Sequence, residues 1–268
     1  MGLRIKFTVG MIGVVLCLSP TALLAQDAKQ IVQQAVNAEL AANRDDHSHW
    51  RYVKTEEGGN KFVVVETESG AISRHIEENG RPASAGIVAA DNQYIQRFIH
   101  DPSLQQKQRQ NGAHDDKSAT ELLNLLPQAF DWRIDSETPD AYILGFRPDP
   151  NFHPPDMEAR VMGEMAGTLV VDKKQHRIQT MKGVLSEDIN IGFGILGRLR
   201  QGGTFDVERR QLAPSLWQIT QTHVHIEGRA LFFKTIGQQE DEVKMDFTEV
   251  PPGTTLEQAV AMLNQPAK

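Results

Sequence analysis

Cysteine is almost missing from this sequence, which has one, Cys17, in 268 residues. Because Cys17 lies inside a predicted export signal (residues 1–25), the mature chain would contain none. That absence excludes disulfide bonds, thiol catalysis and cysteine-based zinc sites together. We therefore expect the exported chain to rely on its hydrophobic core for stability.

Long hydrophobic runs are missing as well. The stretch Phe7 to Leu18 is apolar over 12 residues, which is too short for a membrane-spanning helix of about 20 residues. Arg4 and Lys6 precede it and Ala25 follows it, a pattern typical of a secretory signal cleaved after Ala25. The sequence thus predicts a signal peptide at 1–25 and a periplasmic or secreted protein.

Positive charge is in short supply. Without Arg4 and Lys6, 26 basic residues remain against 35 acidic ones, a net charge of −9. The basic residues form no stripe, so we do not expect the chain to bind nucleic acid. With 40% hydrophobic and 24% charged residues, the composition is that of an ordinary globular protein, which we expect to be a monomer.

Common catalytic signatures are absent too. The sequence has no S-x-x-K, H-E-x-x-H or phosphate-binding loop, and Ser84 lacks the first glycine of a nucleophile elbow. Gly192 to Gly197 matches the G-x-G-x-x-G dinucleotide fingerprint, but Gly202 and Gly203 follow too soon for the helix which that motif requires. We interpret this segment as a glycine-rich connection, and we predict no catalytic residue, no cofactor and no enzymatic activity.

Capping patterns predict helices near both ends of the chain. Asp27 to Gln30 matches a capping box and opens a helix that runs to about Asn43. Thr255 to Gln258 caps a last helix, in which apolar residues recur at helical spacing.

A helical insertion is predicted at about 87–130. Ile87 to Gln110 is rich in helix formers, and a second capping box at Ser118 to Glu121 precedes four leucines. Pro127 should limit or kink that second helix. Between the two helical stretches, Asn111 to Lys117 is interpreted as a polar hinge.

Most of the remaining chain has the short, β-branched and aromatic segments of strands, separated by glycine-containing turns. This pattern predicts one α+β domain over residues 26–268, built on antiparallel strands with peripheral helices. The expected strands are His49 to Glu56, Asn60 to Thr67, Ala71 to Glu78, Asp131 to Ser136, Ala141 to Arg147, Gly167 to Asp172, Arg177 to Leu185, Thr204 to Gln211, Leu216 to Glu227, Arg229 to Ile236 and Glu242 to Glu249. Four prolines between Pro148 and Pro155 predict an extended strap.

Two strands show informative alternation. Val243, Met245 and Phe247 alternate with polar residues, which is typical of a sheet with one wet side. In a regular strand Trp217 and His223 would point to the same side, although one is apolar and the other polar. The apolar side therefore changes between them, and we predict a β-bulge near Thr220 to Thr222.

His223, His225 and Glu227 recur at period two and should project from one side of a strand. Two imidazoles at that spacing can share a zinc or copper ion with a carboxylate. One alternative is therefore a metal-dependent hydrolase that uses His223 and His225; the other is that these side chains simply form the solvated side.

Some strands are apolar on both sides, namely Phe62 to Val65, Tyr142 to Phe146 and Leu231 to Phe233. Either helices or the curl of the sheet cover both sides, or one side lines a groove for an acyl chain. Such a groove needs apolar area rather than a motif. The candidate groove residues are Phe62, Val64, Tyr142, Leu144, Phe146, Trp217, Ile219, Met245 and Phe247.

Gly167 to Asp172, followed by Arg177 and Ile178, resembles part of the lipoprotein-carrier (LolA-like) superfamily, as does the segment Asp246 to Thr255. The resemblance covers residues 167–256, and within that group it points to uncharacterised secreted bacterial members. It implies a strongly curved antiparallel sheet, an open half-barrel, with helices covering a concave face that holds acyl chains.

The expected function is that of a non-enzymatic carrier for a lipid, a lipoprotein acyl group or another hydrophobic ligand. A further alternative, besides the hydrolase, is an envelope sensor or assembly module that binds a protein partner through a sheet edge or the helical insertion.

Overall fold

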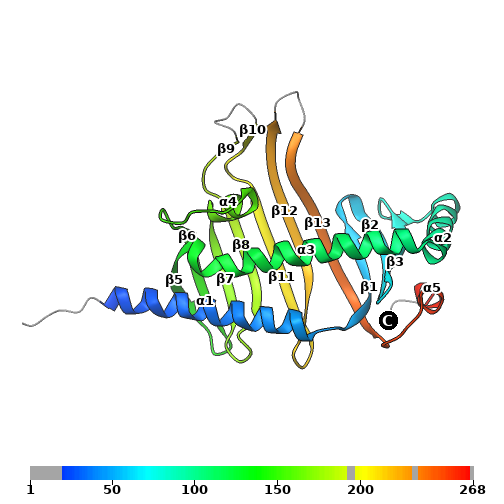
Figure 1. Cartoon of the computed structure of the whole chain (residues 1–268), viewed down its shortest axis with the longest axis horizontal. Coiled ribbons are helices and arrows are strands. Elements are labelled where there is room, and N and C mark those ends of the chain that lie inside the picture. Colours follow the sequence, from blue (N-terminus) through cyan, green and yellow to red (C-terminus); the bar gives the residue numbers. More distant parts are fainter. Residues whose placement is uncertain (1–19, 192–196, 231–234, 266–268) are drawn as a thin grey trace, which may run out of the picture.

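The structure, a computed structural model, describes residues 20–191, 197–230 and 235–265. Its thirteen strands form one antiparallel sheet that is curved and open, because its end strands β4 and β5 do not pair with each other (Figure 1). The strands are β1 (His49–Glu56), β2 (Asn60–Thr67), β3 (Gly70–Glu78), β4 (Arg81–Pro82), β5 (Phe130–Glu137), β6 (Ala141–Pro148), β7 (Met165–Asp172), β8 (Ile178–Leu185), β9 (Ile189–Ile191), β10 (Gly197–Leu199), β11 (Thr204–Ala213), β12 (Leu216–Ala230) and β13 (Thr235–Val250). Their order is β4-β3-β2-β1-β13-β12-β11-β8-β7-β6-β5, with the β9–β10 pair beside β12.

The helices gather on the sheet in two groups. The elements are α1 (Pro20–Asp45), a short 3-10 helix (Glu57–Gly59), α2 (Ala85–His100), α3 (Pro102–Ala129), α4 (Met157–Gly163) and α5 (Leu256–Leu263). In Figure 1, α1 and α3 run across the strands in front of the sheet, while α2 and α5 lie at the end formed by β1 to β3. The predicted α+β class with a curved antiparallel sheet is thus confirmed. Among the described residues, no helix has both the length and the apolar character needed to cross a membrane.

Local side-chain contacts explain where several helices begin. The Ser84 hydroxyl accepts a hydrogen bond from the Ile87 amide at the start of α2, and the Asp101 carboxylate accepts two amides at the start of α3. Pro102 follows at the first position of α3, where its missing N–H costs nothing. The capping box predicted at Thr255 and Gln258 is confirmed at the start of α5.

The polar hinge predicted at Asn111 to Lys117 is wrong, because α3 is continuous over 28 residues. This segment contains helix formers and only one glycine, Gly112. Apolar contacts at both ends of α3 hold the helix, and its middle needs no apolar side of its own. Pro127 also lies inside α3 rather than ending it.

Other boundaries differ from expectation. α1 begins at Pro20, so Asp27 lies inside the helix rather than at its start. Of the predicted strand Arg229 to Ile236, the described residues belong to two strands: Arg229 and Ala230 end β12, and Thr235 and Ile236 begin β13. The short elements β4, β9, β10 and α4 were not predicted. Parts of three predictions fall outside the described residues: the signal peptide at 1–19, the glycine-rich segment at 192–196 and the apolar segment at 231–234.

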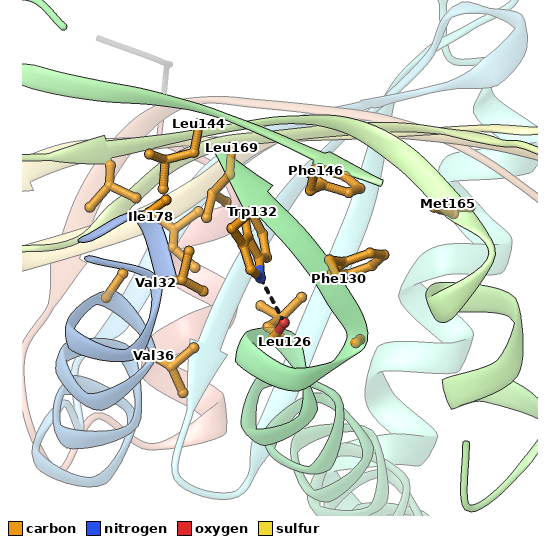
Figure 2. Close-up of a cluster of buried hydrophobic side chains, with 14 of the residues drawn as sticks. Val32, Val36, Leu126, Phe130, Trp132, Leu144, Phe146, Met165, Leu169 and Ile178 are labelled. Carbon is orange, nitrogen blue, oxygen red and sulfur yellow. Dashed lines mark hydrogen bonds between the residues drawn. The ribbon is translucent and has the colours of Figure 1, made fainter. Parts of the chain in front are cut away.

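Two hydrophobic cores occupy the two ends of the sheet. The first core lies between α1, the C-terminal end of α3 and strands β5 to β8 (Figure 2), where the Trp132 indole donates a hydrogen bond to the Leu126 carbonyl. The second core joins β1 to β3 with α2 and α5. Arg51 supports this second group, because its guanidinium donates to the carbonyls of Met262 and Gln265 at the end of α5. A third cluster, on the other side of β1 and β2, contains Trp50, Tyr52 and Val64.

Candidate ligand-binding site

Six apolar side chains follow the middle strands on the side that faces the first core. We call them the apolar strip: Met181 of β8, Phe205 and Val207 of β11, and Ile219, Val224 and Ile226 of β12. Residues directly opposed on antiparallel strands point to the same side; Val207 opposes Met181, and Phe205 opposes Val224. Met181, Phe205 and Ile226 contact the first core, which identifies the side. Val224 is buried, whereas the other five keep part of their surface exposed.

A β-bulge interrupts β12 within the strip. Glu208 opposes Gln221 and Arg209 opposes Ile219, so Thr220 has no partner residue on β11. This confirms the bulge predicted from the change of phase. It also brings Ile219, which is 39% exposed, directly opposite Arg209.

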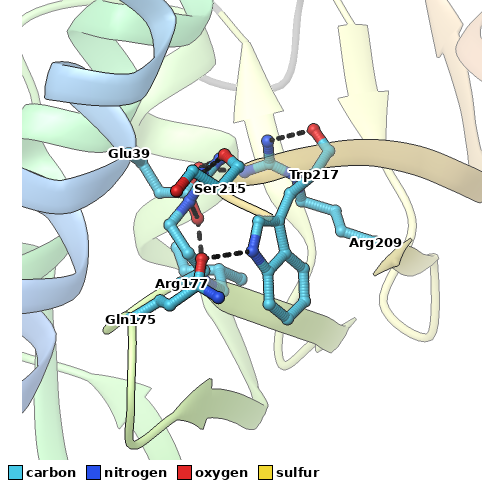
Figure 3. Close-up of polar contacts among 7 residues, drawn as sticks. Glu39, Gln175, Arg177, Arg209, Ser215 and Trp217 are labelled. Carbon is cyan, nitrogen blue, oxygen red and sulfur yellow. Dashed lines mark hydrogen bonds and ion pairs between the residues drawn. The ribbon is translucent and has the colours of Figure 1, made fainter. Parts of the chain in front are cut away.

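Three charged residues lie beside this end of the strip, and we call them the arginine cluster: Glu39 of α1, Arg177 before β8, and Arg209 of β11 (Figure 3). The Arg177 guanidinium donates to both Glu39 oxygens, at 3.0 and 2.9 Å. Arg209 donates to Glu39 as well, and the Ile178 amide adds a bond of 2.8 Å. The Glu39 side chain is fully buried.

The electrostatics of the cluster favour an ionised Glu39. Burial alone would raise the pKa of the Glu39 carboxyl, but the hydrogen bond from Arg177 and the charges of Arg209 and Arg177 outweigh it and hold the pKa below its usual value. Two guanidinium groups therefore share one carboxylate, which leaves an excess of one positive charge beside the strip.

Trp217 joins the strip to the arginine cluster. The Arg177 guanidinium lies 6.0 Å from the centre of the Trp217 ring, and the indole N–H donates to Gln175 at 3.0 Å. The Trp217 carbonyl accepts from Arg209 at 3.4 Å. Both cationic side chains are thus held in place by an aromatic residue that was predicted from the sequence as a groove candidate.

The part of α3 that lies above the middle strands is polar. Every residue of α3 from Arg109 to Lys117 is exposed, although α3 crosses in front of the middle strands in Figure 1. Only toward its C-terminal end, at Leu123 and Leu126, does α3 contact the first core. The middle of α3 therefore contributes no buried apolar side chain above the strip.

Strand register places eight of the nine predicted groove residues, all but Met245, on the same side of the sheet as the strip, but in separate clusters. Leu144 and Phe146 are buried in the first core, with Tyr142 half-buried at its margin. Phe62, Val64 and Phe247 belong to the third cluster. Of the nine, only Trp217 and Ile219 lie at the apolar strip.

Met245 and Phe247 lie on opposite sides of β13, although they were predicted to share one. Met245 opposes Val53 of the second core, whereas the Phe247 ring lies 5.3 Å from that of Tyr52. A register shift at Asp246, whose φ is 57°, reverses the alternation. Met245, which is 44% exposed, therefore lies on the side of β13 away from Phe247.

His223 and His225 do share one side of β12, as predicted, but they contact Asp241 of β13 rather than Glu227. Their ring nitrogens lie 2.7 and 2.9 Å from the same Asp241 oxygen, which are hydrogen-bond distances. Glu227 instead lies 3.9 Å from Arg200. In the part of the chain that the structure describes, no three His, Cys, Asp or Glu residues are arranged to hold a metal ion.

A polar hollow of about 510 Å³ is lined by Asp188, Arg198, Arg200 and Gln201. Two of these lining residues, Asp188 and Arg198, form an ion pair. Its charged lining makes it unsuitable for an acyl chain.

Glu39 is not among the residues predicted from the sequence, although the sequence contains a signal for it. Glu39 falls four residues after Ala35, on the apolar side of the first helix, where a carboxylate requires a cationic partner. The sequence could not say that Arg177 and Arg209 would be those partners, since they are distant along the chain.

Comparison with known proteins does not add to this geometry: no family model, no curated protein and no solved structure matches the chain.

Proposed function

We propose that the protein is a non-enzymatic carrier that binds a lipid, a lipoprotein acyl group or another apolar ligand on the apolar strip. The observation that carries the proposal is the partly exposed strip on β8, β11 and β12, above which the middle of α3 has only exposed residues. Apolar surface of this kind gains free energy whenever a ligand removes it from water. The resemblance of residues 167–256 to lipoprotein carriers supports the same function.

The energetics of such a site depend on chain length. Each methylene that leaves water contributes about 0.8 kcal/mol, which is about fourfold in affinity. A series of saturated chains should therefore bind with affinities that rise by that factor per carbon until the strip is filled. A chain-length series with no trend would contradict apolar binding.

Export belongs to the same proposal. A signal cleaved after Ala25 would deliver the mature chain to the periplasm or the medium, where lipids and lipoproteins are carried between membranes. Cleavage there would leave Asp27 and Gln30 at the start of α1, where they could serve as its capping box. N-terminal sequencing of the protein from an exporting host should give Gln26 as the first residue.

The direct test is native mass spectrometry and lipid extraction of the purified protein, together with titration of a fluorescent apolar probe. We expect bound lipid, and probe binding that saturates at one site. Protein that retains no lipid and takes up no probe would rule the proposal out.

A matched pair of variants locates the site. Ile219 is 39% exposed on the strip, and Val184 is 48% exposed on the opposite side of β8, adjacent to Gly183, which opposes Phe205. Ile219→Gln should weaken probe binding by roughly tenfold, through loss of apolar contact, whereas Val184→Gln should leave it unchanged. Equal effects of the two variants would place binding elsewhere.

A further inference from the structure

We infer that the ligand of the apolar strip is an anionic amphiphile whose negatively charged head group binds at Arg209. This inference rests on the proposed function and narrows it to one ligand class. The shared chemistry is an acyl chain attached to a carboxylate or phosphate, as in a free fatty acid or an anionic phospholipid.

The arginine cluster has more positive than negative charge. Arg177 and Arg209 both bind Glu39, so a single buried carboxylate balances only one of the two cations. A positive charge in a site that is mostly removed from water attracts an anion far more strongly than one at the open surface. The arginine cluster is therefore complementary to a negatively charged group.

Of the two arginines, Arg209 is the one available to bind a head group. Arg177 is 6% exposed and donates to both Glu39 oxygens and to the Ser215 carbonyl. Arg209 is 17% exposed, and its Nε has no hydrogen-bond partner although it is buried. An unsatisfied buried donor is costly, and an anion at Arg209 would offset that cost after a small movement of the side chain.

Arg209 lies at one end of the apolar strip. Arg209 opposes Ile219 across the strands and is two residues from Val207 on the same side of β11. A head group at Arg209 thus places the attached chain on Ile219, Val207 and the residues that follow. The geometry suits a molecule with one charged end and an apolar tail.

Charges at the other edge of the strip favour the same orientation. On the side of β13 that continues the strip, Glu242 opposes Thr222 and Glu240 opposes Val224. Glu242 is bound by Lys54 and Lys244, at 3.5 and 2.9 Å. Lys54 also binds Glu56, at 2.6 Å, so two lysines face two glutamates at this edge and their charges balance. The excess positive charge that an anionic head group requires is therefore at the Arg209 end.

The test compares three ligands of equal chain length, dodecanoic acid, dodecanol and dodecylamine, by displacement of the fluorescent probe at pH 8. We expect the carboxylate to bind roughly tenfold or more tightly than the alcohol, and the ammonium to bind most weakly. Short-chain phosphatidylglycerol compared with phosphatidylcholine distinguishes a phospholipid from a fatty acid source, and preference for either anion supports the inference. Acid and alcohol binding equally would overturn the inference but leave the proposed function standing. If none of the ligands displaces the probe or binds, the proposed function itself fails.

Matched variants assign the preference to Arg209. Arg209→Gln should abolish the preference for the acid while dodecanol binding is kept, and Arg209→Lys should retain part of it. Arg210→Gln is the control, because Arg210 is the next residue of β11, is 62% exposed and pairs with Glu208. If Arg209→Gln keeps the full preference, the head group does not bind there. Should Arg209→Gln fail to fold, the acid-to-alcohol ratio of the unaltered protein and its partial reduction in Arg209→Lys still decide the question.

Discussion

Glu39 brings a negative charge into the interior at the contact between α1 and the sheet. Removing one partner of a buried ion pair usually costs about 3–5 kcal/mol, because the remaining charge loses its compensation. We expect Glu39→Gln to lower the free energy of unfolding by that amount, measured by urea denaturation. The control is Glu121→Gln, which removes an exposed i,i+4 pair with Lys117 and should change stability by less than about 0.5 kcal/mol. Similar losses in the two variants would show that Glu39 does not hold α1.

Asp241 and His225 make the β12–β13 pairing sensitive to pH. The hydrogen bond to Asp241 raises the pKa of His225, so this contribution to stability is complete below about pH 6.5, the unfolded value. It is lost as the pH rises through the folded pKa. Hydrogen bonds from His225 and then His223 lower the pKa of Asp241, so its contribution is present above about pH 3.9 and is lost as the pH falls through the folded value.

The two titrations predict that the contacts of Asp241 with His225 and His223 contribute most to stability between about pH 3.9 and about pH 6.5. His225→Gln should therefore flatten the dependence of Tm on pH above about pH 6.5, measured by thermal unfolding over a pH series. His114→Gln, in the exposed middle of α3, should leave the profile as it is. An unchanged profile in His225→Gln would mean that the hydrogen bond to Asp241 has no energetic consequence.

Single residues also mark where sequence reasoning works and where it stops. The bulge at Thr220 was predictable because Trp217 and His223 reveal the change of phase on their own strand. The bulge at Asp246 was not, since Val243, Met245 and Phe247 alternate regularly in the sequence and only pairing with β1 reveals the shift. The register of a strand depends on its partner as well as on itself. The sequence of one strand reveals a register shift only where its own alternation of apolar and polar residues is interrupted.

At the scale of elements, α3 is a long helix whose polar middle is supported only at its ends. Gly112 lies in that middle, and a Cβ added there would meet no atom within 4 Å. Gly112→Ala should raise the free energy of unfolding by about 0.5–1 kcal/mol, because alanine loses less backbone entropy in a helix. Urea denaturation measures the gain. In Gly167→Ala the new Cβ would collide with the Lys182 carbonyl, so that variant should be strongly destabilised.

The helices and strands themselves were largely predictable, and the exceptions have a common cause. His49 to Glu56 and Asn60 to Thr67 were predicted with their observed bounds because turn residues and hydrophobic alternation agree there. The predicted hinge at Asn111 to Lys117 is wrong because a polar segment can be helical as well as irregular. Local propensity allows a helix, and contacts at Leu104 and Leu126, near the two ends of α3, hold it in place.

At the scale of the molecule, the sequence could not say which apolar side chains on a given side of the sheet would remain exposed. Val63 and Val65 face the second core while Val64 faces the third cluster, so both sides of β2 are buried, as its composition suggested. Which apolar side chains remain exposed depends on where helices end above the sheet. The candidates in β6 were lost to the first core for this reason, whereas Ile219 remained accessible at the strip.

The separation of the two cores predicts how the molecule opens. The first core involves α1 and β5 to β8, the second involves α2, α5 and β1 to β3, and the strands between them carry the strip. Because local stability follows local apolar contacts, Ile95→Ala in the second core should speed amide hydrogen exchange in α2 and α5 while α1 and β6 keep their rates. Leu144→Ala in the first core should do the reverse, with each variant costing about 2–5 kcal/mol. Hydrogen exchange with mass spectrometry resolves these segments, and equal acceleration in both halves would show instead that the curved sheet unfolds as one cooperative unit.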